Sequence, residues 1–201
     1  GVGLGDFNND GLLDIFLSGN QVSNRLYLNE GGFKFRDITV AAGLESAGVW
    51  STGVSVVDIN NDGLLDIYVC KSGNPQAVRR KNELFINLGD LTFKEAAADY
   101  GLDFIGLSIH ASFFDYDKDG DLDCYLLNNS IRSVGIFDFR KNQRSIPDPD
   151  GGNKLLKNDN GVFRDVSEVA GIYTSKIGFG LGIAVGDINN DNWQDIYVAN
   201  D

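Results

Sequence analysis

Aspartate and asparagine side chains recur at alternate positions in four short segments of the chain. The first segment reads Asp6-Phe-Asn8-Asn-Asp10-Gly-Leu-Leu-Asp14. Oxygen side chains therefore stand at loop positions 1, 3, 5 and 9, and the backbone carbonyl at position 7 is also available. This is the ligand set of a hard, flexible cation that takes roughly 6 to 8 oxygen ligands. The chemistry that the spacing predicts is calcium binding.

The same pattern begins again at Asp58, Asp115 and Asp187, so up to four structural Ca²⁺ ions are expected. Position 6 is Gly in three loops and Asn192 in the fourth, and these are the two residue types that best tolerate the sharp turn. The expected ligands, with position 7 contributing its carbonyl, are Asp6, Asn8, Asp10, Leu12, Asp14, Asp58, Asn60, Asp62, Leu64, Asp66, Asp115, Asp117, Asp119, Asp121, Asp123, Asp187, Asn189, Asp191, Trp193 and Asp195.

Other readings of these loops fit less well. Magnesium prefers compact octahedral sites that retain water, and zinc would require Cys or His ligands. An EF-hand would need Glu at position 12, where the chain has Leu17, Val69, Leu126 and Val198. Plain Asx turns between strands remain the simplest alternative, but four repeats with alternating oxygen ligands favour calcium.

Composition restricts the class of protein and of partner. The chain has 29 acidic and 17 basic residues and a formal charge of −12, which argues against nucleic acid or an anionic membrane surface as a partner. Bound Ca²⁺ would cancel much of this charge. Hydrophobic residues make up 42%, enough for a substantial core, and no apolar run is long enough for a direct membrane span.

The loops recur inside a longer repeat whose other parts predict four short strands. Small and branched residues precede each loop, and a continuous apolar run typical of a strand buried on both faces follows it. A hairpin comes next, and each unit then closes on a Gly expected in a left-handed conformation. In order along the repeat, the expected strands are 53–57, 111–114 and 180–185; 15–17, 67–70, 125–127 and 196–199; 26–29, 84–87 and 155–158; and 33–35, 92–94 and 162–164.

This pattern predicts an all-β fold, a β-propeller whose blades have four antiparallel strands, with about three and a half blades in the chain. The repeat units fall at approximately 1–43, 44–101, 102–171 and 172–201, the last one incomplete. The chain begins inside a motif and without Met, so we expect it to be part of a longer protein. Further blades of the same protein or another subunit are expected to complete the ring.

The residues resemble FG-GAP/VCBS repeats, the calcium-loop blades also found in the integrin α-subunit propeller. Gly178-Phe179-Gly180 is similar to the FG element itself. The fuller pattern, Asn-x-Leu-Tyr/Phe-x-Asn, Ala-Gly-Leu and Asp-x-Asn-Asn-Asp-Gly-x-x-Asp-Ile-Tyr, is most similar to secreted proteins that pair such repeats with an ASPIC/UnbV domain. The resemblance implies a propeller of seven blades and carries the calcium-ligand roles onto the residues named above. Asn192 departs from the usual Gly, which bears on the geometry or affinity of the fourth site.

The resemblance further implies an extracellular or cell-surface protein, secreted or on a bacterial outer membrane, whose propeller is a non-enzymatic adhesion scaffold. Its partner is expected to be a protein or glycan that contacts the connections 71–82 and 129–153, which should project from the face opposite calcium. Basic residues gather there and would suit an acidic partner, although a solvated loop is the simpler reading. The alternatives are a subunit of a bacterial outer-membrane assembly and the propeller of a polysaccharide-degrading enzyme.

A few single residues are expected to have structural roles. Cys70 and Cys124 are too few for a disulfide framework and are expected as buried free thiols. His110, the one histidine, is expected to line the central channel or to pair locally. Trp50 and Trp193 are expected to pack rather than to bind ligand.

Overall fold

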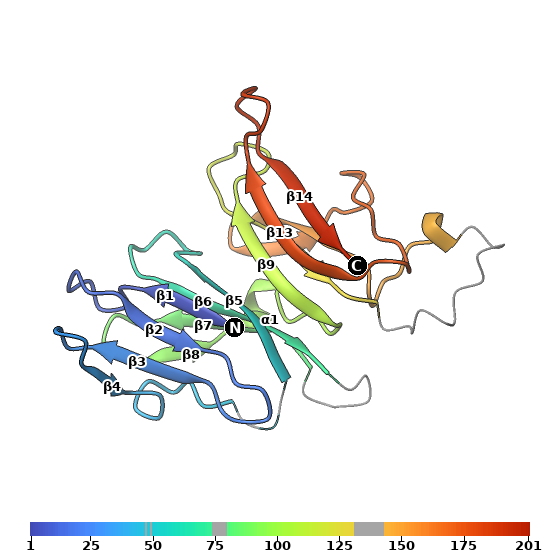
Figure 1. Ribbon diagram of the computed structural model, residues 1–201. Coiled ribbons are helices and arrows are strands. Elements are labelled where there is room, and N and C mark those ends of the chain that lie inside the picture. Colours follow the sequence, from blue (N-terminus) through green and yellow to red (C-terminus); the bar gives the residue numbers. More distant parts are fainter. Residues whose placement is uncertain (47, 49, 74–79, 131–142) are drawn as a thin grey trace.

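A computed structural model describes residues 1–46, 48, 50–73, 80–130 and 143–201 of the chain (Figure 1). These residues form three four-stranded antiparallel sheets and one two-stranded sheet, in which strands that follow one another along the chain are neighbours. The predicted all-β fold of propeller blades is therefore confirmed. The predicted total of seven blades stays a prediction.

The four sheets follow one another along the chain and are referred to as blades 1 to 4. Blade 1 contains β1 (Val2–Gly5), β2 (Asp14–Leu17), β3 (Arg25–Asn29) and β4 (Phe35–Asp37); blade 2 contains β5 (Trp50–Val57), β6 (Asp66–Ser72), β7 (Glu83–Asn87) and β8 (Phe93–Glu95); blade 3 contains β9 (Ser108–Phe114), β10 (Asp123–Asn128), β11 (Lys154–Asp159) and β12 (Val162–Asp165); and blade 4 contains β13 (Gly180–Gly186) and β14 (Asp195–Asn200). The helical segments among the described residues are α1 (Ala97–Tyr100) and the 3₁₀ turn η3 (Gln143–Ser145). The boundaries of the sequence repeats stay a prediction, because the sheets end several residues short of them.

The first strands of the blades lie side by side around a common axis. β5 contacts both β1 and β9, and β13 contacts β9, as Figure 1 shows for the strands near its centre. Close approach requires small residues here: a Cβ added to Gly53 would lie 2.4 Å from the carbonyl oxygen of Ile109 and 2.5 Å from Nδ1 of His110. A small residue at this position therefore allows β5 and β9 to approach closely.

The second strands supply much of the core. All six residues of β10 are buried, as are the first six of β6, which fits the continuous apolar runs that predicted strands covered on both faces. Apolar clusters fill the spaces between consecutive blades. Phe16 and Ile67 belong to the first cluster, Tyr68 and Leu126 to the second, and Tyr125 and Ile196 to the third.

Left-handed glycines close the first three repeats as predicted. Gly43, Gly101 and Gly171 have φ angles of 75°, 73° and 70°. At Gly101 the backbone N–H caps the end of α1 by donating to the carbonyl oxygens of Ala97 and Ala98.

The structure confirms the expectations for the cysteines and places His110 beside a cavity. Cys70 and Cys124 are buried free thiols, and His110 lines a cavity of about 590 Å³ between the first strands of the blades. Trp50 and Trp193 are 49% and 48% exposed, and the centre of the Trp193 ring lies 3.9 Å from the Lys118 ammonium. That the tryptophans pack rather than bind ligand stays a prediction. The described part of the chain has no helix with the length and apolar character that a membrane crossing requires.

Candidate metal centre

Each Asp-rich segment connects the first two strands of a blade. In all four blades, the residue before the loop pairs with the position 9 aspartate, as in Gly5 with Asp14 and Val57 with Asp66. Positions 1 to 8 thus form the whole connection, and position 9 is the first residue of the next strand. We call these connections loops 1 to 4, at residues 6–14, 58–66, 115–123 and 187–195.

The backbone of each loop wraps around the position 1 carboxylate. The N–H of position 5 donates to Oδ1 of position 1, over distances of 3.0 Å (Asp10 to Asp6), 3.0 Å (Asp62 to Asp58), 3.1 Å (Asp119 to Asp115) and 3.1 Å (Asp191 to Asp187). The N–H of position 6 donates to Oδ2 of the same carboxylate in every loop. The position 5 carboxylate in turn accepts the N–H of position 7. Carboxylates held in this way keep lone pairs free to bind a cation.

This wrapping requires left-handed backbone at two positions of every loop. Position 4 has φ near 60° in each case, and position 6 has φ of 86°, 85° and 98° at Gly11, Gly63 and Gly120. Asn192 takes φ of 68° at position 6 of loop 4, and its N–H donates to Asp187 Oδ2 over 2.8 Å. The departure from Gly at Asn192 therefore leaves the loop geometry in place, because Asn tolerates this conformation.

The position 9 aspartates are the fully buried carboxylates of loops 1 to 3. Asp66 accepts the N–H of Ile59 at 3.1 Å and the N–H of Asn87 at 2.8 Å, so it ties the loop to the third strand of its blade. Burial raises the pKa of Asp66 from 3.8 to about 6, and the nearby carboxylates of Asp62 and Asp58 add to the increase. Burial likewise raises the pKa of Asp14.

Two position 5 aspartates, Asp119 and Asp191, behave in the opposite way because they are exposed and well supplied with donors. The N–H of Asp121 and then the ammonium of Lys157 lower the pKa of Asp119. The N–H of Trp193 lowers the pKa of Asp191 in the same manner. Loop 3 thus combines an outer carboxylate, Asp119, whose pKa is lowered with an inner one, Asp123, whose pKa burial raises and whose charge is costly until a cation offsets it.

The position 3 side chains provide the observation most specific to a metal. Asn8 Oδ1 and Asp117 Oδ1 are buried, yet neither accepts a hydrogen bond from any described residue. Buried oxygens are ordinarily satisfied, so an oxygen without a donor inside a ring of carboxylates fits a metal ligand. In loops 2 and 4 the matching oxygens of Asn60 and Asn189 accept the N–H of position 5.

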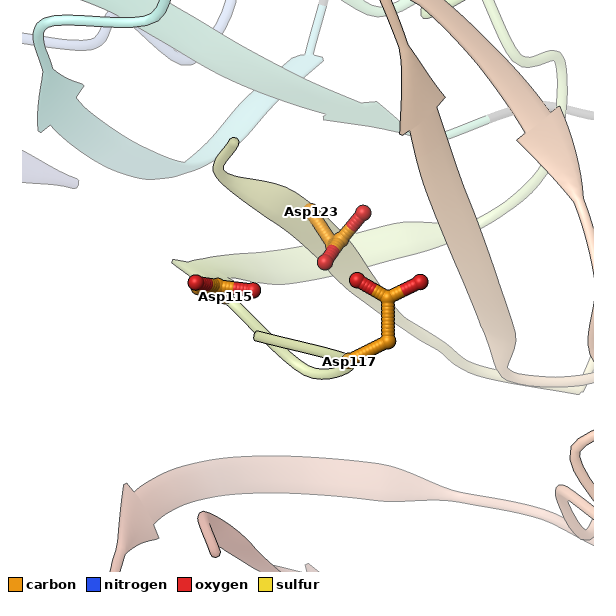
Figure 2. A group of neighbouring side chains, drawn as sticks. All are labelled: Asp115, Asp117 and Asp123. Carbon is orange, nitrogen blue, oxygen red and sulfur yellow. The ribbon is translucent and has the colours of Figure 1, made fainter. Parts of the chain in front are cut away.

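Loop 3 brings three carboxylates closest together. One oxygen each of Asp115, Asp117 and Asp123 lies within 4.8 Å of the other two, and Figure 2 shows these side chains grouped where the loop meets β10. Oxygens that share a calcium ion at about 2.4 Å must be separated by less than about 5 Å, so the spacing suits this ion. The residues present therefore fit Ca²⁺ in donor type, spacing and unsatisfied oxygen.

The structure places the predicted ligand side chains of each loop around one turn. The roles of the position 7 carbonyls of Leu12, Leu64, Asp121 and Trp193 stay predictions, since the contacts seen there are those of the N–H groups.

Sequence reasoning gave no role to three asparagines at or next to the ends of the third strands, Asn29, Asn87 and Asn158. Their N–H groups donate to the position 9 carboxylates, and their side-chain amides donate to the position 8 carbonyls. The recurring Asn-x-Leu-Tyr/Phe-x-Asn pattern was the signal that could have found them.

Comparison with known proteins agrees with the repeat pattern. Residues 6–69 match the FG-GAP-like repeat family, which confirms the expected resemblance over loops 1 and 2. The chain is 26% identical over 154 residues to Cartilage acidic protein 1 of Xenopus tropicalis, a match that covers 74% of this chain and 23% of that protein. The chain thus spans about a quarter of that relative's length.

A solved structure also resembles the chain. It is that of an Agrocybe aegerita lectin described as recognising non-reducing terminal N-acetylglucosamine, and it matches 98% of this chain and 46% of its own with a TM-score of 0.49 and 17% identity. A likeness at this level says nothing about the ligand of the present chain.

Proposed function

We propose that this part of the chain is a calcium-stabilised propeller scaffold that binds a protein or glycan partner outside the cell or at its surface. The observation that carries the calcium assignment is the pair of buried oxygens, Asn8 Oδ1 and Asp117 Oδ1, that have no donor among the described residues. Four loops of the same geometry support it. The extracellular setting rests on the resemblance to FG-GAP repeats, and extracellular calcium is plentiful enough to fill even weak sites.

The ligand side chains would link two strands of a blade to a third. Positions 1, 3 and 5 lie on the turn, position 9 begins the second strand, and its carboxylate accepts an N–H from the end of the third strand in blades 1 to 3. When bound, Ca²⁺ supplies the positive charge that offsets these clustered carboxylates. The turn, which contributes few buried apolar side chains, would then be fixed to the rigid sheet.

Neighbouring loops also touch one another, which supports a shared structural role. Asn9 of loop 1 donates its side-chain N–H to the carbonyl of Gly63 in loop 2 over 3.3 Å. The Lys118 ammonium of loop 3 lies 3.9 Å from the centre of the Trp193 ring in loop 4. Ordering one loop is therefore expected to help order its neighbour.

The partner surface that we propose lies on the opposite face, which we call the insertion face, formed by connections from the second to the third strands and between blades. In Figure 1 the β1–β2 turn lies at the left and the β13–β14 turn at the top, whereas η3 lies on the right. A cavity of about 890 Å³ opens beside η3 and is lined by Arg144, Ile146, Ile172 and Tyr173 among others. Such a mixture of aromatic, aliphatic and charged groups suits a sugar or a peptide.

The walls of this cavity are held by backbone contacts. The N–H of Asp148 donates to the carbonyl of Thr174 over 2.7 Å, and Pro147 forms a bridge with Ser175. Tyr173 is 56% exposed and would supply a rigid contact at low entropic cost.

The basic residues that suggested an acidic partner are only partly available. Lys81 pairs with Asp103 at 2.5 Å, and Arg80 donates to the carbonyl of Gly106 at 3.1 Å. Lys71, at the start of the expected 71–82 connection, is buried inside β6. Arg144 lines the cavity, whereas Arg79, Arg132, Arg140 and Lys141 lie outside the described residues. Arg144 is therefore the described basic residue that best supports an acidic partner.

Binding at the insertion face can be tested with Tyr173→Ala. The variant and the unchanged protein would be applied in calcium to an array of neutral and acidic oligosaccharides and to immobilised extracellular matrix extract. Loss of a bound species in Y173A supports the cavity. Phe33→Ala is the matched control, because Phe33 is 97% exposed in the turn between β3 and β4 on the calcium side. Equal retention by Y173A and F33A would place the partner elsewhere.

We further propose that the propeller is completed by more blades of the same protein or by another subunit, as in an outer-membrane assembly. Large apolar side chains are exposed on the outermost blades: Val2 and Leu4 are 59% and 56% exposed in blade 1, and Leu181 and Tyr197 are 62% and 64% exposed in blade 4. Surfaces of this kind are ordinarily covered. Light scattering of this region alone would show self-association if they are not.

A catalytic role is not part of the proposal. Burial lowers the pKa of His110, and burial raises the pKa of both Cys70 and Cys124, so neither thiol is suited to nucleophilic attack. Incubation with acidic and neutral polysaccharides, followed by a reducing-sugar and unsaturated-product assay, is expected to give no turnover. Product formation would favour the enzyme alternative.

A further inference from the structure

Loop 3 differs from the other three loops in two linked ways. Position 3 is Asp117, where loops 1, 2 and 4 have Asn8, Asn60 and Asn189. Lys157 comes immediately before Asn158 in the third strand of blade 3, and the residues at the matching positions of blades 1 and 2 are Leu and Ile. The extra carboxylate and the extra ammonium therefore occur in the same blade.

The structure brings these two residues together. Nζ of Lys157 is within ion-pair distance of Asp117 Oδ2 and lies 3.0 Å from Asp119 Oδ2. Its ammonium donates a hydrogen bond to each of these two carboxylates. A positive charge already lies between two of the four carboxylates that would surround the ion in loop 3.

In the other loops the position 5 carboxylate accepts a hydrogen bond from the position 3 side chain of the same loop. The side-chain amide of position 3 donates to Oδ2 of position 5, over 2.9 Å from Asn8 to Asp10 and 2.8 Å from Asn60 to Asp62. Asn189 makes the same contact with Asp191 over 2.9 Å. In loop 3 position 3 is a carboxylate and cannot donate, and the Lys157 ammonium makes this contact instead.

We infer that Lys157 is a tethered cation of loop 3, which holds Asp117 and Asp119 in place without metal and makes this loop the weakest calcium site of the four. The inference rests on the proposed calcium binding. An ammonium among the ligand carboxylates repels Ca²⁺, and the ion must either displace it or share the cluster with it. Asp117 Oδ1, which has no donor among the described residues, remains available to an ion while Lys157 holds Oδ2.

Calcium binding can be followed loop by loop through the position 6 glycines. The amides of Gly11, Gly63 and Gly120 each donate to the position 1 carboxylate of their own loop. A calcium titration of ¹⁵N-labelled protein, followed by the amide shifts of these glycines, would report loops 1, 2 and 3 separately. In the unchanged protein, Gly120 is expected to shift at about tenfold higher calcium than Gly11 and Gly63.

The test variant is Lys157→Leu, which places in β11 the residue that β3 has at the matching position, and Lys157→Gln keeps the chain length should Leu impair folding. Both are expected to lower the calcium midpoint of Gly120 by about tenfold or more. The double variant D117N/K157L should bring that midpoint close to the midpoint of Gly11. Lys94→Leu is the matched control, because it removes the same charge from an exposed strand residue whose ammonium pairs with Asp99, a residue outside the loops.

The possible results separate the two proposals. If Gly11 and Gly63 respond to calcium but the midpoint of Gly120 is the same in K157L, K157Q and K94L, the role of Lys157 is refuted and calcium binding stands. If none of the three amides responds to millimolar calcium in the unchanged protein, the calcium proposal itself fails.

Discussion

Asp66 makes the stability of the calcium-free protein depend on pH in a way that calcium should reverse. Its side chain is fully buried at position 9 of loop 2 and accepts the N–H groups of Ile59 and Asn87. These two donors favour the ionised form, but burial outweighs them and raises the pKa from 3.8 to about 6. The folded protein therefore holds this proton over a pH range in which the unfolded chain has released it.

The sign and size of the effect follow from this difference in pKa. Between pH 3.8 and about 6 the native state binds more protons than the unfolded state, so the free energy of unfolding falls as the pH rises. The difference corresponds to about 3 kcal/mol, present in full below pH 4 and lost above pH 6. Asp14 and Asp123, whose pKa values burial also raises, should add to the loss.

Calcium removes this loss because it binds the ionised carboxylate. The increase in unfolding free energy on adding a fixed concentration of calcium should therefore be smaller at pH 4.5 and larger by about 2 kcal/mol at pH 7. Urea unfolding in EDTA and in 10 mM CaCl₂, measured at several pH values by tryptophan fluorescence, gives both quantities.

Asp66→Asn isolates the contribution of this side chain. The variant cannot ionise, so its stability in EDTA should vary less with pH than that of the unchanged protein, even if the lost hydrogen bond lowers stability throughout. Asp201→Asn removes an exposed carboxylate at the last residue and should leave the pH dependence unchanged. A calcium-free stability that rises between pH 4.5 and 6.5, or a calcium increment independent of pH, would refute the reasoning.

Three further expectations concern the scaffold. Gly53→Ala should cost about 2 kcal/mol in urea unfolding, because its Cβ would meet a backbone carbonyl at 2.4 Å, whereas Gly182→Ala has nothing within 4 Å and should be near neutral; equal costs would contradict the crowding of the axis. Lys71→Met should lower the free energy of unfolding by about 3 kcal/mol, because the carboxylate of Glu83, 2.7 Å from the Lys71 ammonium, would lose its ion-pair partner. A neutral result would show that this ion pair is dispensable. Cys70 and Cys124 should react with a thiol reagent only as fast as the protein unfolds, because both are buried and burial raises both pKa values; rapid reaction in the native state would contradict that burial.

Much of the fold could be predicted because the repeat shows the same hydrophobic pattern in each copy. The apolar runs that follow the loops became the buried strands β6 and β10, and the loops became their connections to the preceding strands. The exposure of Trp50 and Trp193 could not be predicted, because large aromatic side chains look apolar in sequence whichever side of a blade they occupy.

The candidate site was predictable in its ligands and not in what supports them. Alternating oxygen residues indicate a cation site by themselves, since spacing within one turn fixes which side chains can converge. The contact between Lys157 and Asp117 joins residues 40 positions apart, and it depends on the register of β11 against β10. Neither the local spacing of residues nor the composition predicts that strand register. The same applies to Asn87, which reaches both Asp66 in its own blade and the carbonyl of Phe7 in blade 1.

The most direct test of calcium binding is the number of ions held per chain at equilibrium dialysis against about 10 mM CaCl₂, a concentration above the dissociation constants typical of extracellular calcium sites. Four similar loops predict a value close to four, with loop 3 the last to fill. A value near zero would contradict calcium binding. The repeated carboxylates, and the oxygens of Asn8 and Asp117 that accept no hydrogen bond from the described residues, would then need another explanation.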